Sequence, residues 1–242
     1  MSQIFHRTAN TLARLSIVLV VSAVTLVFTL MAVVYRSNWW SGVGERRAQP
    51  VPFSHEHHVR GLGIDCRYCH TGVEDSPFAG LPSTKTCMTC HSQLWTNAEL
   101  LEPVRQAYRT GQPVPWTRVH RLPDFVYFDH SVHVAKGVAC ITCHGPVDRM
   151  PLMYQQNTLY MQWCLECHRH PDRYVGPKEA VFATSLTPDG KIDYEGAMTM
   201  ARMRANGDYA SFWKSAENGE TWAHRYHVKG TNKMADCYTC HR

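Results

Sequence analysis

The cysteines of this chain follow one pattern along its 242 residues. All ten occur in five C-x-x-C pairs, and a histidine follows each pair directly. With this cysteine and histidine content, about 0.03 such motifs would arise by chance in a chain of this length. No cysteine remains for a structural disulfide or a nucleophile. We therefore expect the five motifs to decide what the chain folds around.

The motif is typical of c-type haem attachment. Two thiols at this spacing can each add to one vinyl group of a single porphyrin, and the histidine that follows lies under the ring and binds the iron. The predicted thioether residues are Cys66, Cys69, Cys87, Cys90, Cys140, Cys143, Cys164, Cys167, Cys237 and Cys240. The predicted proximal iron ligands are His70, His91, His144, His168 and His241. The expected cofactor is five covalently bound haems c.

Other uses of paired cysteines fit this pattern less well. Zinc sites do not require a histidine after every second cysteine. Thioredoxin-like motifs need a βαβ context, which the sequence does not show. Iron–sulfur clusters use other cysteine spacings.

An internal repeat lies upstream of two motifs. Residues 53–58 and 128–133 both read Phe-x-His-x-x-His. The first histidine stands 11 residues before Cys66 in one copy and 10 residues before Cys140 in the other. This repeat predicts a duplicated two-haem module, with the motif at Cys237 left as a single haem.

The repeat also predicts distal iron ligands. Two imidazoles three residues apart on one helical turn point the same way, so they can reach two neighbouring haems. The predicted distal ligands from the repeat are His55, His58, His130 and His133. We expect His57 and His170 to be ordinary surface residues.

The distal ligand of the fifth iron is left open by the sequence. His120, ten residues before His130, is the favoured candidate, and His227 and His224 are weaker ones. A methionine is the remaining option, and it would raise the potential of that haem relative to two histidines. The available methionines are Met150, Met153, Met161, Met198, Met200, Met203 and Met234.

One uncharged apolar stretch, residues 15–35, precedes the motifs. A helix of this length spans about 31 Å, enough to cross a hydrocarbon core of about 30 Å. Arg7 and Arg14 precede it and two tryptophans follow, which predicts a cytoplasmic N-terminus at residues 1–14. No small-x-small cleavage site follows, so we expect a retained anchor and not a cleaved signal peptide. The expected location is the inner (cytoplasmic) membrane, single-pass, with the haem domain on the periplasmic side.

The expected fold is a mainly α-helical and irregular multihaem cytochrome c with a haem-dominated core and one N-terminal transmembrane helix. Its expected parts are a linker at 36–52 and a pentahaem domain at 53–242, with haem pairs at 53–95 and 120–170, a haem-free insert at 171–236 and the fifth haem at 237–242. The formal charge of +5 could suggest nucleic acid as a partner. Five haems bring ten propionates, which would change that charge to about −5, so we expect no nucleic acid.

Local patterns predict a few further elements. Thr96 with Glu99 is a candidate capping box for a helix that has Leu100, Val104 and Tyr108 on one face. Within the insert, residues 182–186 and 191–194 flank a turn and predict a hairpin, and residues 197–205 predict a helix.

The repeated pattern resembles the class III, low-potential multihaem cytochromes, in which the two histidines serve different haems. A longer resemblance is carried by residues 119–133, 140–145 and 161–169. On these residues the chain is similar to the pentahaem subunit of alternative complex III, a bacterial quinol:electron-acceptor oxidoreductase. The resemblance covers the transmembrane helix and all five motifs.

This resemblance implies an electron-transfer subunit without a substrate site of its own. Electrons from a quinol-oxidising membrane complex would pass through its haems to a downstream cytochrome or another acceptor. The implied partners are an integral quinol-binding subunit, an iron–sulfur subunit and a monohaem cytochrome. One alternative is a stand-alone membrane-anchored multihaem quinol dehydrogenase. A multihaem reductase fits less well, because the resemblance to pentahaem nitrite reductase would lead us to expect lysine after one C-x-x-C pair.

Overall fold

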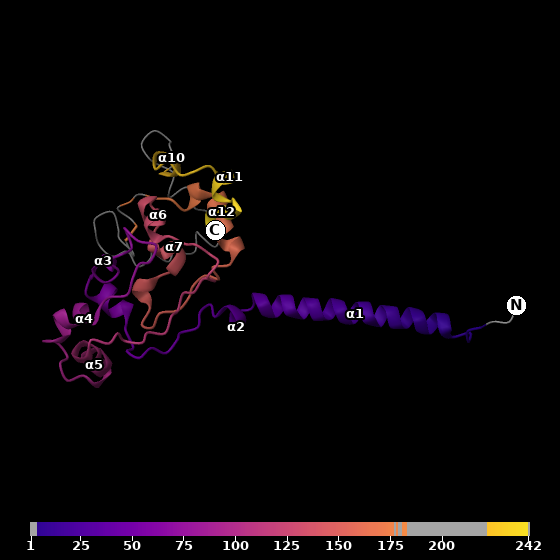
Figure 1. The fold of residues 1–242 in the computed structure, drawn as a ribbon, viewed down its shortest axis with the longest axis horizontal. Helices are drawn as coiled ribbons and strands as arrows, with labels where there is room; N and C mark the ends of the chain where they lie inside the picture. Colours follow the sequence, from indigo (N-terminus) through magenta and orange to yellow (C-terminus); the bar gives the residue numbers. More distant parts are fainter. Residues whose placement is uncertain (1–3, 177, 179–180, 183–221, 242) are drawn as a thin grey trace. The chain divides into compact units, whose positions relative to one another are not determined.

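The structure, a computed structural model, describes residues 4–176, 178, 181–182 and 222–241. The chain divides into two compact units, Met1–Val43 and Gly44–Arg242. The described residues form helices and short helical turns, with two isolated antiparallel bridges and no longer strand. The predicted fold class, mainly helical and irregular with one apolar N-terminal helix, is confirmed (Figure 1).

The first unit holds a long apolar helix. α1 covers Ala9–Arg36, so it begins before the predicted span of 15–35, and α2 follows at Asn38–Ser41. None of the residues of α1 is buried, and the helix is long and apolar enough to cross a membrane. Two of its hydroxyls are satisfied within the helix, since Thr25 donates to the carbonyl of Val21 and Thr29 to that of Thr25. This matters in hydrocarbon, where water cannot satisfy polar groups.

The second unit is a succession of short helices. Their bounds are η1 Glu56–Gly61, α3 Cys66–Cys69, α4 Thr84–His91, η2 Glu99–Leu101, α5 Glu102–Thr110, α6 His130–Ala135, α7 Cys140–His144, η3 Val147–Arg149, α8 Met161–Arg169, η4 Pro171–Arg173, α10 Trp222–Arg225, α11 Thr231–Met234 and α12 Cys237–Cys240. Each C-x-x-C-H motif lies on one of them: α3, α4, α7, α8 or α12. Helices this short are marginal alone, so tertiary contacts must stabilise them.

Aspartate caps begin three of these helices. Asp65 accepts from the backbone N–H of Arg67 at 2.8 Å, and Asp236 accepts from that of Tyr238 at 3.0 Å. Asp129 caps α6 in the same way. Each cap is worth about 1 kcal/mol, a large contribution for a one-turn helix.

The helix after the second motif begins later than the sequence predicts. α5 starts at Glu102 and has leucine as its N-cap, with no side-chain cap. Pro103 in the first turn suits this start, because that position needs no backbone N–H. Its buried residues are Val104 and Ala107, whereas Leu100 and Tyr108 are exposed.

Residues 44–52 belong to the second unit, although the sequence predicts a linker over 36–52. The Gln49 side chain exchanges two hydrogen bonds with the backbone of Thr117, both at 2.9 Å. Val51 is buried in a small cluster with Val104, Ala107 and Val114. The predicted hairpin and the predicted helix at 197–205 lie outside the described residues, apart from Phe182.

A second small cluster joins Val138, Val175 and Ala223. Beside it, Gly137 has φ +79°, and a Cβ there would lie 2.2 Å from the carbonyl oxygen of Gly176. Gly63 has φ +69°, with open space around its Cβ position. Both glycines have the left-handed backbone that favours glycine, but only Gly137 lies against another segment of backbone.

We predict that Gly137→Ala destabilises the second unit by about 2–5 kcal/mol, from backbone strain plus a backbone clash. Gly63→Ala, the matched control, should cost only the strain, about 1–2 kcal/mol. Guanidinium unfolding of the detergent-solubilised holo-protein measures both. Equal losses would contradict the close packing at Gly137.

Candidate haem sites

The two copies of the repeat share one local geometry. In the first, Phe53 meets His55 edge-on at 4.9 Å between ring centroids and stacks on His58 at 4.4 Å. In the second, Phe128 meets the first histidine edge-on at 4.8 Å and stacks on the second at 4.6 Å. The phenylalanine therefore fixes the directions of both imidazoles in each copy.

The copies differ by one residue, and a π-helix takes up the difference. η1 is a π-helix, whereas α6 is an α-helix. The backbone N–H of Ile64 donates to the carbonyl of His58, and that of Val138 donates to the carbonyl of His133. The donor therefore follows the acceptor by six residues in the first copy and by five residues in the second. The π-helix thus absorbs the extra residue after the histidines, which keeps the ligand geometry unchanged.

Three imidazole pairs recur at one separation. The ring centroids of His58 and His91 are 6.2 Å apart. Those of His130 and His144, and those of His133 and His168, are also 6.2 Å apart. An iron–nitrogen bond is about 2 Å long, as for zinc, and the centre of an imidazole ring lies about 1 Å beyond its nitrogen. Two axial imidazoles on one iron therefore have ring centres about 6 Å apart. Each pair joins one repeat histidine to one motif histidine, and its separation fits an iron between them.

The fourth repeat histidine lies near the first motif. Burial, together with nearby His70 and His58, lowers the pKa of His55 to about 4. Its Nδ1 is buried without a hydrogen-bond partner. In the second copy, His130 is the first repeat histidine, and it pairs with His144 of the first motif in that module. By the duplication, His55 would pair with His70 in the same way.

Most of these histidines are oriented by the backbone. Nδ1 lies within hydrogen-bond distance of a carbonyl oxygen in His58, His70, His91, His130, His133, His168 and His241, at 2.6–3.2 Å. A proton on Nδ1 leaves the Nε2 lone pair for a metal, which is the usual outer arrangement of a ligating histidine.

The thiols fit porphyrin attachment better than a metal cluster. All ten cysteines are free, and burial raises the pKa of several of them, that of Cys140 to about 12. The described part of the chain contains no group of three or more His, Cys, Asp or Glu side chains placed to hold a metal ion. The ten free cysteines and the imidazole pairs fit haem c, with thioether bonds from the cysteines and iron between the imidazoles.

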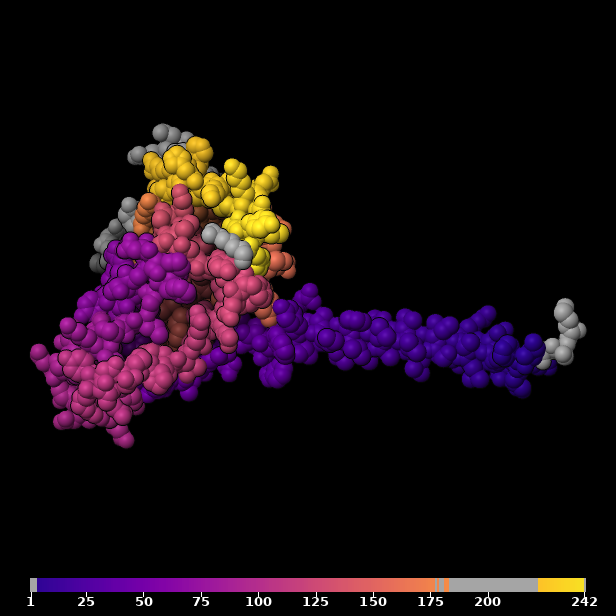
Figure 2. All heavy atoms as spheres, viewed as in Figure 1, coloured from indigo at the N-terminus to yellow at the C-terminus, as the bar shows by residue number. Residues whose placement is uncertain are grey.

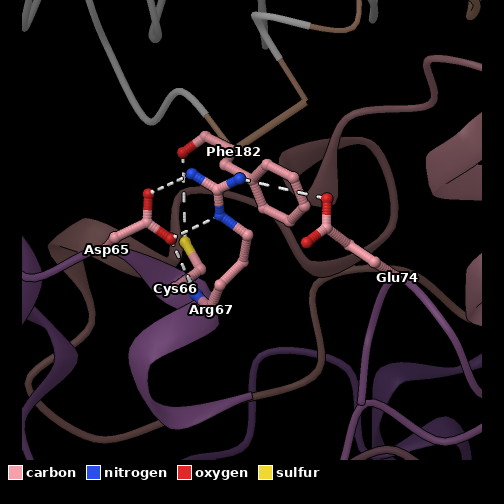
Figure 3. Close-up of polar contacts among 5 residues, drawn as sticks. All are labelled: Asp65, Cys66, Arg67, Glu74 and Phe182. Atoms are coloured by element: carbon pink, nitrogen blue, oxygen red, sulfur yellow. Dashed lines mark hydrogen bonds and ion pairs between the residues drawn. The ribbon is translucent and has the colours of Figure 1, made fainter. Parts of the chain in front are cut away.

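Polar contacts fix the first motif (Figure 3). The Arg67 guanidinium binds Asp65 through two hydrogen bonds, at 2.9 and 3.0 Å, and lies 3.9 Å from Glu74. It also lies 4.5 Å from the ring centroid of Phe182. The Tyr68 hydroxyl contacts the hydroxyl of Thr89 in the second motif at 2.9 Å. The two residues between the cysteines thus anchor this motif to its surroundings.

The fifth motif is held differently. Nδ1 of His241 donates to the carbonyl of Phe125 at 3.1 Å, and the ring centroids of these two residues are 5.8 Å apart. The backbone N–H of Tyr127 donates to the carbonyl of Cys240 at 2.8 Å. The C-terminal segment therefore lies against residues 125–127 (Figure 2).

The candidates for a fifth distal ligand lie in different places. The ring of His120 contacts that of His144. The ring that contacts His241 is that of Phe125. His224 and His227 are exposed on and just after α10. Met150 is fully buried, and Met161 is exposed. Met198, Met200 and Met203 lie outside the described residues.

The sequence could not reveal the outer partners of the imidazoles. His70 donates to the carbonyl of Gly80, His130 to that of Pro77 and His168 to that of Met234. A backbone carbonyl is present at every residue, so no residue type marks its role. Of these partners, Gly80 has a left-handed backbone, with φ +79°.

A helical chain built around such motifs and paired imidazoles is a multihaem c-type cytochrome, an electron-transport protein with an N-terminal membrane-anchoring helix. No family model matches the chain. It is 33% identical over 155 residues to the multihaem cytochrome c subunit of menaquinone reductase from Nitratidesulfovibrio vulgaris. The aligned part covers 54% of this chain and 74% of that relative. The chain therefore belongs to the family of that cytochrome subunit, and covalently bound c-type haems are its cofactors.

We predict that His58→Ala removes one distal ligand and converts one low-spin haem to high spin, because water or no ligand replaces the imidazole. Low-temperature EPR of the purified protein should lose about a fifth of its low-spin intensity if five haems contribute equally. His57→Ala is the matched control, since this neighbour is exposed and stacks on Trp95. An unchanged spectrum for the His58 variant would remove His58 from the ligand set.

Proposed function

We propose that this chain carries electrons through five haems c within a membrane-bound quinone–quinol oxidoreductase. The observation that carries this proposal is the recurring pair of imidazoles, each made of one repeat histidine and one motif histidine, 6.2 Å apart. Haem c supplies one-electron chemistry at a potential set by its axial ligands and its burial. Two imidazoles on one iron leave no coordination position for a substrate.

The ligand set follows from the pairs. In this proposal His55, His58, His130 and His133 complete the first, second, third and fourth haems, opposite His70, His91, His144 and His168. The ten motif cysteines hold the porphyrins. For the second ligand of the fifth haem, opposite His241, the candidates are His227, His224, His120 and the methionines.

The relative supports the kind of complex. Its name makes it a subunit of menaquinone reductase. The resemblance to alternative complex III favours the opposite net direction, from a quinol-oxidising partner to a downstream cytochrome. We propose this second direction, with an integral quinol-binding subunit, an iron–sulfur subunit and a monohaem cytochrome as partners. Arg7 ahead of α1 and Arg14 near its N-terminal end, both before the uncharged stretch 15–35, favour the inner membrane, with the second unit on the periplasmic side.

Contacts between motifs support an order in space that differs from the order in sequence. The first and second motifs meet through Tyr68 and Thr89, and both their distal histidines come from residues 55–58. The segment after the first motif contacts the proposed distal ligand of the third haem, because the carbonyl of Pro77 accepts from both Nδ1 and the backbone N–H of His130. Burial raises the pKa of Cys140, and neighbouring Cys66 raises it further.

The remaining motifs extend the same line. α6 carries both His130 and His133, which ties the third motif to the fourth. His168 donates to the carbonyl of Met234, just before the fifth motif, and α8 packs against α11. We therefore propose the spatial order second, first, third, fourth, fifth. The second and fifth motifs form the two ends, where partners would exchange electrons.

We predict that the purified chain stains for peroxidase activity on a denaturing gel and has an intact mass equal to the polypeptide plus five haems. The purified complex should reduce cytochrome c with a quinol, whereas the isolated subunit should not. Quinol oxidation by the subunit alone would favour a stand-alone dehydrogenase. A high-spin haem that binds nitrite in the wild type would favour a reductase.

We predict that the iron positions of the holo-protein, located by anomalous scattering or cryo-EM, follow the proposed order. The nearest neighbour of the second haem should be the first, and the third should lie between the first and the fourth. An arrangement that places the second haem next to the third, as in the sequence, would overturn the order and leave the electron-transfer role standing.

A further inference from the structure

One motif histidine has a side chain as its outer partner. Nδ1 of His144 lies 3.3 Å from Nε2 of His120, and their ring centroids are 4.4 Å apart with planes at 74°. The outer nitrogens of the four other motif histidines meet backbone carbonyls. His144 therefore has the one outer hydrogen bond among the motif histidines that a substitution can remove.

The surroundings of His120 suit an acceptor. It is partly buried, and its ring lies edge-on to that of His144. A neutral imidazole can accept a hydrogen bond through its unprotonated nitrogen. If His144 binds iron through Nε2, its proton lies on Nδ1 and points at His120.

We propose that His120 is a positioning residue that accepts the Nδ1 proton of His144 and lowers the potential of the third haem. This inference rests on the proposed function, because it requires a haem at the third motif. An outer acceptor raises the basicity of a ligating imidazole, and a more basic ligand favours the ferric state. An imidazole nitrogen is a more basic acceptor than a backbone carbonyl, so the effect should be larger at this haem than at the others.

The position gives the contact its importance. In the proposed spatial order the third haem joins the first two-haem module to the second. Its potential therefore sets how readily electrons cross between the modules. The contact also occupies Nε2 of His120, the nitrogen that the sequence-based assignment to the fifth iron would need.

The test compares three variants of the holo-protein by redox titration and EPR. His120→Leu removes the acceptor and should shift the midpoint potential of one haem upward, with haem content and low-spin intensity unchanged. His120→Gln keeps an acceptor oxygen and should restore most of the wild-type potential. His57→Leu, a change at an exposed histidine, should shift none.

Other outcomes overturn the proposal in distinguishable ways. A new high-spin haem in His120→Leu would make His120 an iron ligand, and five unchanged potentials would make the contact irrelevant. A wild-type protein without haem would instead refute the proposed function. If the leucine variant does not fold, redox-difference infrared spectra of the wild type decide the question. One histidine ring band should stand apart from those of the other motif histidines, and a single common band would refute the role.

Discussion

The hydrogen bond between a histidine Nδ1 and a backbone carbonyl is the contact on which the haem sites depend. An imidazole on a one-turn helix is free to rotate about two side-chain bonds, and an axial ligand must point one nitrogen at the iron. Pro77, Phe125 and Met234 supply carbonyls from distant segments, and Gly80 supplies one from ten residues further along the chain. Each such bond fixes a ring and also ties two parts of the chain together. The same contacts that orient ligands thus hold much of the second unit in shape.

The rest of the polypeptide offers little core of its own. Among the described residues, the large side chains that are fully buried are Met150, Val181 and Asp148. The two apolar clusters are built mostly from valine and alanine. A chain with so small a core needs other constraints. Aspartate caps, left-handed glycines and imidazole–carbonyl bonds provide them in this structure, and thioether bonds to porphyrin would add covalent ones.

The duplicated module shows how a ligand geometry tolerates an insertion. The extra residue of the first copy lies between the histidines and the attachment motif, where a π-helix absorbs it. The phenylalanine contacts on the histidines, which lie before the insertion, keep the same angles and nearly the same distances in both copies. An insertion between the two histidines would have rotated one imidazole by about 100° around the helix. The position of the extra residue is therefore as informative as its presence.

The amino-acid sequence by itself determined the chemistry of the attachment motifs, the apolar anchor and the repeat, because each is a local pattern of residue types. It also predicted which histidines are distal iron ligands, through the three-residue spacing of His55 with His58 and of His130 with His133. Only the tertiary structure decided which motif histidines His58, His130 and His133 face, that residues 44–52 belong to the second unit, and that His120 lies beside His144. Those outcomes depend on contacts between segments as far apart as Phe125 and His241. Many of these contacts are made by backbone carbonyls, which every residue carries and which no sequence pattern distinguishes.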